Sequence, residues 1–286
     1  MHVNLHEIDV VPDWFATRAA RAAGRTGPAW SMMRPTLREA VKRREFYYEY
    51  QPIVSTSDCS LLGYEALVRW RHAGGTVLPA DFIWIAEQTG TIADIQSCAL
   101  SGMSEALVVT DPGLTFAINW SPSQLMRCEE IARFIELVHS LGIVPSRLTI
   151  EITEGSLLNL SAATLGNIGR LKQAGFAIAL DDFGAGYCGL GYLKDLPVDR
   201  LKIDQSFVRD MVASPKARTI VAAIVDLAHG LGISVVAEGV ETVPQLEMLR
   251  AMQCDYVQGF LLGRPSAWIS GVSTIAACHP PAESLQ

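Results

Sequence analysis

From residue 114 onward, the sequence alternates between short strand-like segments and longer helical ones. The strand-like segments cover residues 114–120, 147–153, 176–182, 200–204, 233–239 and 255–260. The helical patterns between them cover residues 128–142, 161–175, 189–197, 217–232 and 243–253. Alternation of this kind is typical of parallel strands joined by helical crossovers, and this many units favours closure into a barrel. We therefore predict an α/β fold, a TIM-like (β/α)8 barrel.

The start of the pattern departs from this alternation. A helical segment at residues 36–46 leads into two consecutive strand-like segments, 46–54 and 61–70, joined by the turn-rich "STSDCS". Such a pair can form an antiparallel hairpin. Two helical segments, 79–90 and 92–107, then precede the regular alternation.

The pattern also suggests domain limits. Residues 1–34 carry four arginines among alanines and read as an N-terminal extension, weakly ordered or partly helical. A barrel domain is expected over residues 35–270, followed by a C-terminal tail at 271–286. A length of 286 residues fits one barrel of this kind.

Charge and apolar content exclude some classes of partner. The net charge of −7 and a pI of about 5.4 argue against binding of duplex nucleic acid. No apolar stretch is long enough for a transmembrane segment, and the N-terminus lacks a signal-peptide core. The six cysteines show no zinc spacing, and we interpret them as reduced thiols of a cytoplasmic protein.

A polar residue recurs near the carboxyl end of each strand-like segment. These residues are Glu65, Asn119, Glu151, Asp181 with Asp182, Lys202, Glu238 and Gln258. Side chains alternate along a strand, so Ala177, Ala179 and Asp181 share one face, and small inward residues lead to a carboxylate. Barrel enzymes place their chemistry at the carboxyl ends of the strands. The sequence therefore predicts one polar site at the mouth of the barrel.

Carboxylates and an amide make an all-oxygen donor set, which suits Mg²⁺ or Mn²⁺ better than zinc. Two adjacent aspartates suit a two-metal site, where bound cations offset the repulsion between Asp181 and Asp182. Structural roles remain open for single residues. Glu65 can form a salt bridge with Arg69, Asn119 can cap a helix, and Lys202 can simply neutralise the acids.

Several motifs together resemble the EAL-domain family of cyclic di-GMP phosphodiesterases. They span about residues 40–266 and read "YQPIV", "GYEALVRW", "PADFIWIAEQTG", "AINWSPSQL", "IEITE", "DDFGAGY", "LKIDQSFV", "VVAEGVET" and "YVQGFLLGRP". The resemblance implies a TIM-like barrel whose first strand is antiparallel, in agreement with the hairpin-like start.

The resemblance also implies roles for individual residues. The metal ligands would be Glu65, Asn119, Glu151, Asp181 and Asp182. The catalytic residues would be Lys202 and Glu238 together with Glu65, the substrate contacts Gln51, Leu67, Arg69 and Gln258, and the residue that steadies the loop after the aspartates Glu154. This loop departs from the family pattern, because Cys188 and Gly189 stand where serines are usual.

The implied function is hydrolysis of cyclic di-GMP to linear 5′-pGpG by two-metal activation of water. Mg²⁺ or Mn²⁺ would support the reaction, Ca²⁺ would inhibit it, and the protein would form a homodimer. One alternative is a cyclic di-GMP receptor that does not hydrolyse its ligand and acts through protein contacts. The residues alone also allow a metal-dependent lyase of the enolase type, which the "EAL" stretch with Arg69 and the "DDFG" motif disfavour.

Overall fold

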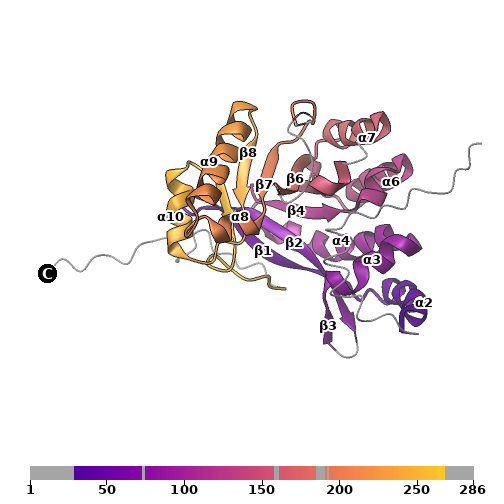
Figure 1. Ribbon diagram of the computed structural model, residues 1–286. Helices are drawn as coiled ribbons and strands as arrows, with labels where there is room; N and C mark the ends of the chain where they lie inside the picture. The colour runs from indigo at the N-terminus through magenta and orange to yellow at the C-terminus, as the bar shows by residue number, and fades with distance from the viewer. Residues whose placement is uncertain (1–28, 73–74, 158–160, 185–190, 192, 268–286) are drawn as a thin grey trace, which may run out of the picture.

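The computed structural model describes residues 29–72, 75–157, 161–184, 191 and 193–267, and of 29–35 the backbone alone. Within these residues, eight strands form a closed ring in the order β1-β9-β8-β7-β6-β5-β4-β2, and pairing of β1 with β2 closes it. The short strand β3 is added outside the ring (Figure 1). The strands are β1 (Phe46–Ser55), β2 (Leu61–His72), β3 (Gly75–Val77), β4 (Thr115–Trp120), β5 (Leu148–Thr153), β6 (Ala177–Phe183), β7 (Arg200–Ile203), β8 (Ser234–Ala237) and β9 (Tyr256–Gln258).

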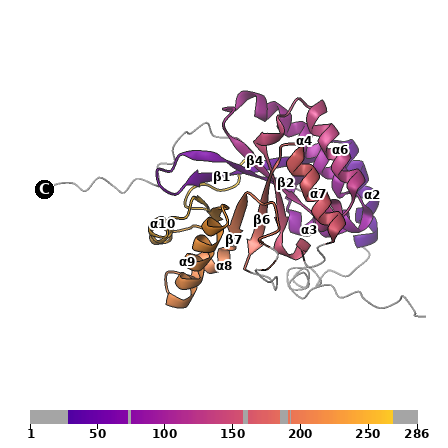
Figure 2. The ribbon, with the colours of Figure 1, turned by 90° about the horizontal axis from the view of Figure 1, so that it is seen from above.

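Helices surround these strands. They are α2 (Ala29–Lys42), α3 (Pro79–Thr89), α4 (Ile92–Val109), α5 (Pro122–Leu125), α6 (Cys128–Ser140), α7 (Ala162–Gln173), α8 (Gln205–Asp210), α9 (Pro215–Gly230) and α10 (Val243–Ala251), with 3₁₀ turns η2 (Pro145–Arg147) and η3 (Glu154–Leu157). In Figure 2, helices α8, α9 and α10 lie on one side of the strands, and α3, α4, α6 and α7 lie on the other.

Strand orientation confirms the predicted fold. Strand β1 runs antiparallel to both of its neighbours, β2 and β9. All other neighbouring strands of the ring are parallel to each other. The protein is therefore a TIM-like barrel with an antiparallel first strand, as the sequence and the resemblance predict.

Strand β2 is longer than expected. Its pairing with β4 ends at Ala66 and Ile118, but β2 continues to His72 by pairing with β1 and β3. The expectation that Glu65 ends its strand is therefore wrong, because Glu65 lies in the middle of β2. The remainder of β2 continues past its last pairing with β4 and carries Leu67 and, beyond the level of Trp120, Arg69.

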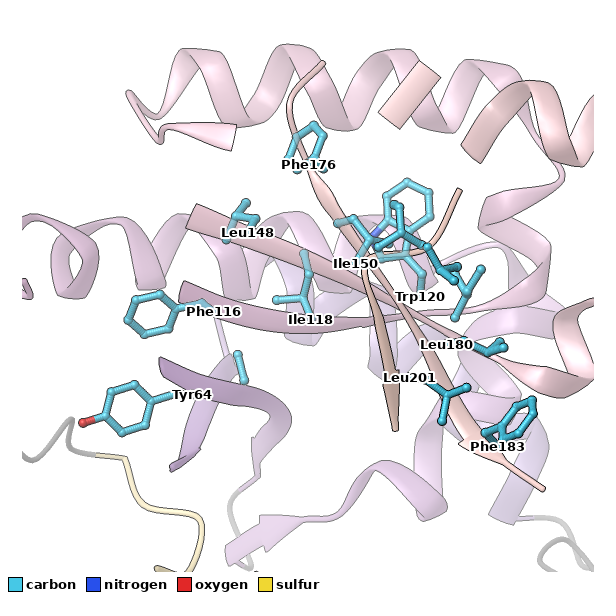
Figure 3. Close-up of a cluster of buried hydrophobic side chains, with 14 of the residues drawn as sticks. Tyr64, Phe116, Ile118, Trp120, Leu148, Ile150, Phe176, Leu180, Phe183 and Leu201 are labelled. Atoms are coloured by element: carbon cyan, nitrogen blue, oxygen red, sulfur yellow. The ribbon is translucent and has the colours of Figure 1, made fainter. Parts of the chain in front are cut away.

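The core lies between the ring and the helices. Figure 3 shows apolar side chains of neighbouring strands packed together, among them Phe116 and Ile118 of β4, Ile150 of β5 and Leu180 of β6. All four are fully buried. The residues that alternate with them include Asn119, Glu151 and Asp181. This period of two separates an apolar outer row from an inner row of small and polar side chains, as predicted.

Three local expectations need correction. The helix expected over 36–46 begins and ends earlier, as α2 (Ala29–Lys42), and its first residues lie in the segment expected to be weakly ordered or partly helical. The helix expected over 189–197 falls partly outside the described residues, and its described end, 193–195, is a turn before Pro197, which cannot donate a backbone hydrogen bond. Cys59 is disulfide-bonded and therefore not a reduced thiol, whereas Cys98, Cys128 and Cys254 are free thiols.

None of the described helices combines the length and the apolar character that crossing a membrane requires.

Closure of the barrel between β2 and β4 depends on Gly63. A Cβ at this position would lie 1.9 Å from the carbonyl oxygen of Thr115. We expect Gly63→Ala to lower the free energy of unfolding by about 3 kcal/mol, since the two strands must separate to admit the methyl group. Urea denaturation followed by circular dichroism measures the loss.

Gly102→Ala is the matched control. Gly102 lies on the exposed face of α4, where an added Cβ meets no atom within 4 Å. This variant should gain about 1 kcal/mol from higher helix propensity. Equal stability of the two variants would contradict the role assigned to Gly63.

Candidate active site

Lys202 of β7 lies at the centre of a cluster of carboxylates inside the barrel mouth. Its side chain is 1% exposed, and its Nζ lies 2.6 Å from Glu238 Oε1, 2.9 Å from Glu151 Oε2, 3.3 Å from Asp181 Oδ1 and 3.4 Å from Glu65 Oε2. These four acids come from β2, β5, β6 and the residue after β8. The lysine therefore links the inner faces of four strands with the residue that follows β8.

A local distortion of β6 brings the two adjacent aspartates to the same site. Neighbouring residues of a regular strand point to opposite faces. Asp182, however, has a left-handed backbone with φ of 56°, and the register with β7 shifts between Leu180 and Phe183. One carboxylate oxygen each from Asp181, Asp182 and Glu238 consequently lies within 4.8 Å of the others. Aspartate tolerates this backbone conformation better than most residues.

Amide side chains hold the carboxylate of Glu65 in place. Asn119 Nδ2 donates to Glu65 Oε1 at 2.8 Å, and Gln258 Nε2 donates to Glu65 Oε2 at 2.7 Å. Gln258 Nε2 also donates to Gln51 Oε1 at 3.0 Å. Within the part of the chain that the structure describes, the buried Oε1 of Gln258 has no hydrogen-bond partner, so an acceptor remains available inside the site.

Burial and crowding shift the proton affinities of these groups. Burial lowers the pKa of Lys202, but the surrounding carboxylates outweigh it and raise that pKa well above its usual value. Burial raises the pKa of Glu238 to about 8; Lys202 opposes this rise, and Asp181 and Glu65 add to it. Burial also raises the pKa of Glu151 well above its usual range, again against the effect of Lys202. The single positive charge of Lys202 is thus too small to neutralise all the acids that surround it.

Glu65 differs from these two acids. Burial favours a higher pKa for Glu65, but Lys202 and the hydrogen bonds from Gln258 and Asn119 outweigh burial and lower it. Lys202 and the two amide donors therefore favour the charged form of Glu65.

The predicted substrate contacts fall into two groups. Gln51 and Gln258 are buried and bonded to each other beside Glu65. Leu67 and Arg69 lie farther along β2, and among the described residues no hydrogen bond or ion pair joins Arg69 to the acid cluster. Arg69 is paired instead with Glu49 of β1, a residue that the sequence motifs do not mark. Glu49 lies two residues before Gln51, and this spacing is the sequence signal that would have placed Glu49 on the same face of β1.

Glu154 lies at the start of η3, behind the aspartate pair. It is 3% exposed, and its Oε2 accepts a hydrogen bond of 3.0 Å from the backbone N–H of Gly184. Gly184 is the first residue after β6, so Glu154 contacts the beginning of the loop that follows the aspartates. Cys188 and Gly189 lie outside the described residues.

The arrangement defines a class of protein: a TIM-like barrel with a buried cluster of oxygen donors at its mouth. The model of the EAL domain family matches residues 34–265. The chain therefore belongs to the EAL domain family.

Individual relatives agree with this assignment. The chain is 39% identical over 231 residues to an uncharacterized signaling protein of Caulobacter vibrioides, covering 80% of this chain and 29% of that protein. It is 37% identical over 238 residues to the cyclic di-GMP phosphodiesterase NbdA of Pseudomonas aeruginosa, covering 82% of this chain and 30% of NbdA. The chain thus spans about 30% of the length of these two curated relatives.

A solved structure gives the same fold. The PaMucR phosphodiesterase, in complex with cyclic di-GMP, superposes with a TM-score of 0.75 at 36% identity, covering 80% of this chain and 95% of that one. MucR is a protein of Pseudomonas aeruginosa.

The central position of Lys202 predicts a large effect on stability. Lys202→Met leaves several buried carboxylates without their cation, and we expect a loss of about 3–5 kcal/mol in the free energy of unfolding, measured by urea denaturation in EDTA. Mn²⁺ should restore part of this loss, because a divalent cation replaces the missing positive charge.

Lys172→Met is the control for this experiment. Lys172 pairs with Asp199 at 2.6 Å, but the two side chains are 32% and 39% exposed. Loss of such a pair lowers stability by about 1 kcal/mol or less. A Lys202→Met variant that loses no more than this control would contradict the central role of the lysine.

Proposed function

We propose that this protein is a metal-dependent phosphodiesterase that hydrolyses cyclic di-GMP to linear 5′-pGpG. The observation that carries the proposal is the buried cluster of oxygen donors around Lys202, in a member of the EAL domain family. NbdA and PaMucR, both similar to this chain, are named as phosphodiesterases, and the PaMucR structure holds cyclic di-GMP.

The donor set fits hard divalent cations. Carboxylate and amide oxygens are the ligands that Mg²⁺ and Mn²⁺ prefer. The proposed ligands are Glu65, Asn119, Glu151, Asp181 and Asp182. Together with Glu238, the site holds five carboxylates and one ammonium, so full ionisation would leave four negative charges, which two divalent cations would balance. When bound, such ions lower the pKa of water and stabilise negative charge on a phosphate.

Lys202 and Glu238 are the groups proposed to orient and deprotonate the attacking water. Glu238 Oε1 accepts from Lys202 at 2.6 Å, so the carboxylate is held by an ammonium group while its side chain remains 19% exposed. In this position Glu238 can accept a proton from water, and Lys202 can orient the water by donating a hydrogen bond. Water adds across one P–O3′ bond, which leaves a 5′-phosphate and a free 3′-hydroxyl.

The proposed substrate contacts lie on the other side of Glu65. The unpartnered Oε1 of Gln258 can accept a hydrogen bond from a bound base or from water. Arg69 is suited to a phosphate oxygen, because the guanidinium group offers several N–H donors in one plane. Leu67 lies between Glu65 and Arg69 on the same face of β2 and would pack against the nucleotide.

The direct test is incubation of the purified protein with cyclic di-GMP and separation of the products by chromatography. We expect linear pGpG with Mg²⁺ or Mn²⁺ and none with EDTA. Ca²⁺ should bind without supporting turnover, because its coordination is longer and less rigid. Asp181→Asn, which removes a ligand charge, should reduce turnover by at least about 100-fold, whereas Asp210→Asn at an exposed position of α8 should not.

Full activity in EDTA would refute the metal requirement. Binding of cyclic di-GMP without any product would instead favour the receptor, and turnover of a carboxylate substrate would favour the lyase.

A second prediction separates chemistry from binding. Glu238→Gln keeps an acceptor for Lys202 but removes the proposed proton acceptor, so kcat should fall by at least about 100-fold while binding in Ca²⁺ changes by less than about threefold. Arg69→Ala should weaken that binding by about tenfold, with a smaller effect on kcat. Isothermal titration calorimetry and initial rates measure the two quantities, and the reverse pattern would overturn these assignments.

A further inference from the structure

An ion pair holds Arg69 at the barrel mouth before any ligand arrives. Arg69 Nε donates to Glu49 Oε2 at 2.7 Å, and the two side chains are only 9% and 23% exposed. The pair joins the two strands of the hairpin. In the antiparallel register Glu49 lies opposite Leu67, and Tyr47 lies opposite Arg69, so Glu49 reaches Arg69 diagonally across the hairpin.

The guanidinium group is fixed at two points. Besides the contact with Glu49, Arg69 Nη1 donates to the carbonyl oxygen of Val68 at 3.0 Å. Arginine has five N–H donors, and these two contacts use only two of them. A planar group held at both Nε and Nη1 has a defined orientation, and its remaining donors keep a defined direction.

The pair shares a face with the acid cluster. Residues directly opposite each other in an antiparallel pair point to the same side of the sheet, and every second residue along a strand does so too. Gln51 and Glu65 are opposite each other, as are Glu49 and Leu67. The face that carries the Glu49–Arg69 pair is therefore the face that carries Glu65, farther out along the hairpin.

We propose that Glu49 is a positioning residue, which orients Arg69 so that its remaining N–H groups meet a phosphate of the bound dinucleotide. This inference rests on the proposed function, which supplies the phosphate. An arginine already immobilised by Glu49 loses less rotamer freedom when the ligand binds. Glu49 thus acts on substrate binding through Arg69 and takes no part in the attack on phosphorus.

The test compares Glu49→Ala with Glu49→Gln and with a matched control. Glu45→Ala is the control, because Glu45 also accepts an N–H from β2, that of Trp70 at 3.0 Å, and its side chain is 24% exposed. We expect Glu49→Ala to raise KM for cyclic di-GMP about tenfold with kcat within about twofold. Glu49→Gln keeps an acceptor for Arg69 Nε and should restore KM to within about threefold of wild type. Glu45→Ala should leave KM unchanged.

A double-mutant cycle shows whether Glu49 acts through Arg69. In an Arg69→Ala background, Glu49→Ala should have no further effect on KM. Equilibrium binding of cyclic di-GMP in Ca²⁺ should follow the same pattern, and thermal melting of each variant checks that it is folded.

Four results would overturn the proposal: an unchanged KM in Glu49→Ala, a lower KM in that variant, no rescue by glutamine, or an effect that persists without Arg69. A lower KM would mean that Glu49 competes with the phosphate. Absence of product from the wild-type protein refutes the proposed phosphodiesterase activity separately. The binding measurement then still tests whether Glu49 and Arg69 act together on the nucleotide.

Discussion

The buried ammonium group of Lys202 is the interaction on which the site depends. A lysine that is 1% exposed is stable only where acidic partners offset the loss of its hydration. Here the four partners come from the middle of β2, from β5 and β6, and from the residue after β8, so Lys202 fixes the distances between these parts of the ring. The same acids exceed the lysine in number, which leaves a concentration of negative charge at the mouth of the barrel.

Two departures from regular strand geometry adapt this barrel to its site. The left-handed backbone of Asp182 brings a second aspartate to the same side as Asp181. The extension of β2 beyond β4 carries Arg69 above the ring, where Glu49 of β1 holds it. The first departure gathers negative charge inside the mouth, and the second places a fixed positive group at its rim. Together they give a charge distribution suited to cations inside and a phosphate beside them.

Much of this could be predicted from the sequence. Alternation of strands and helices predicted the barrel, the recurrence of polar residues near the strand ends predicted that Glu151 and Lys202 lie in one site, and the period of two predicted that Asp181 faces inward. Contacts between residues distant in sequence were harder to predict. Nothing local indicates that Asp182 adopts a positive φ, because a residue with a Cβ rarely does so. The partner of Arg69 depends on the hairpin register, and the sequence left open a salt bridge between Arg69 and the nearby Glu65.

The central claim is that the carboxylates around Lys202 form a site for divalent cations. Anomalous diffraction from crystals grown with Mn²⁺ tests this most directly, since the scattering locates each manganese ion without reference to activity. The account predicts peaks within bonding distance of the carboxylates of Asp181 and Asp182, and their loss in Asp181→Asn. A fully bound manganese ion elsewhere, with no peak at these aspartates, would contradict it.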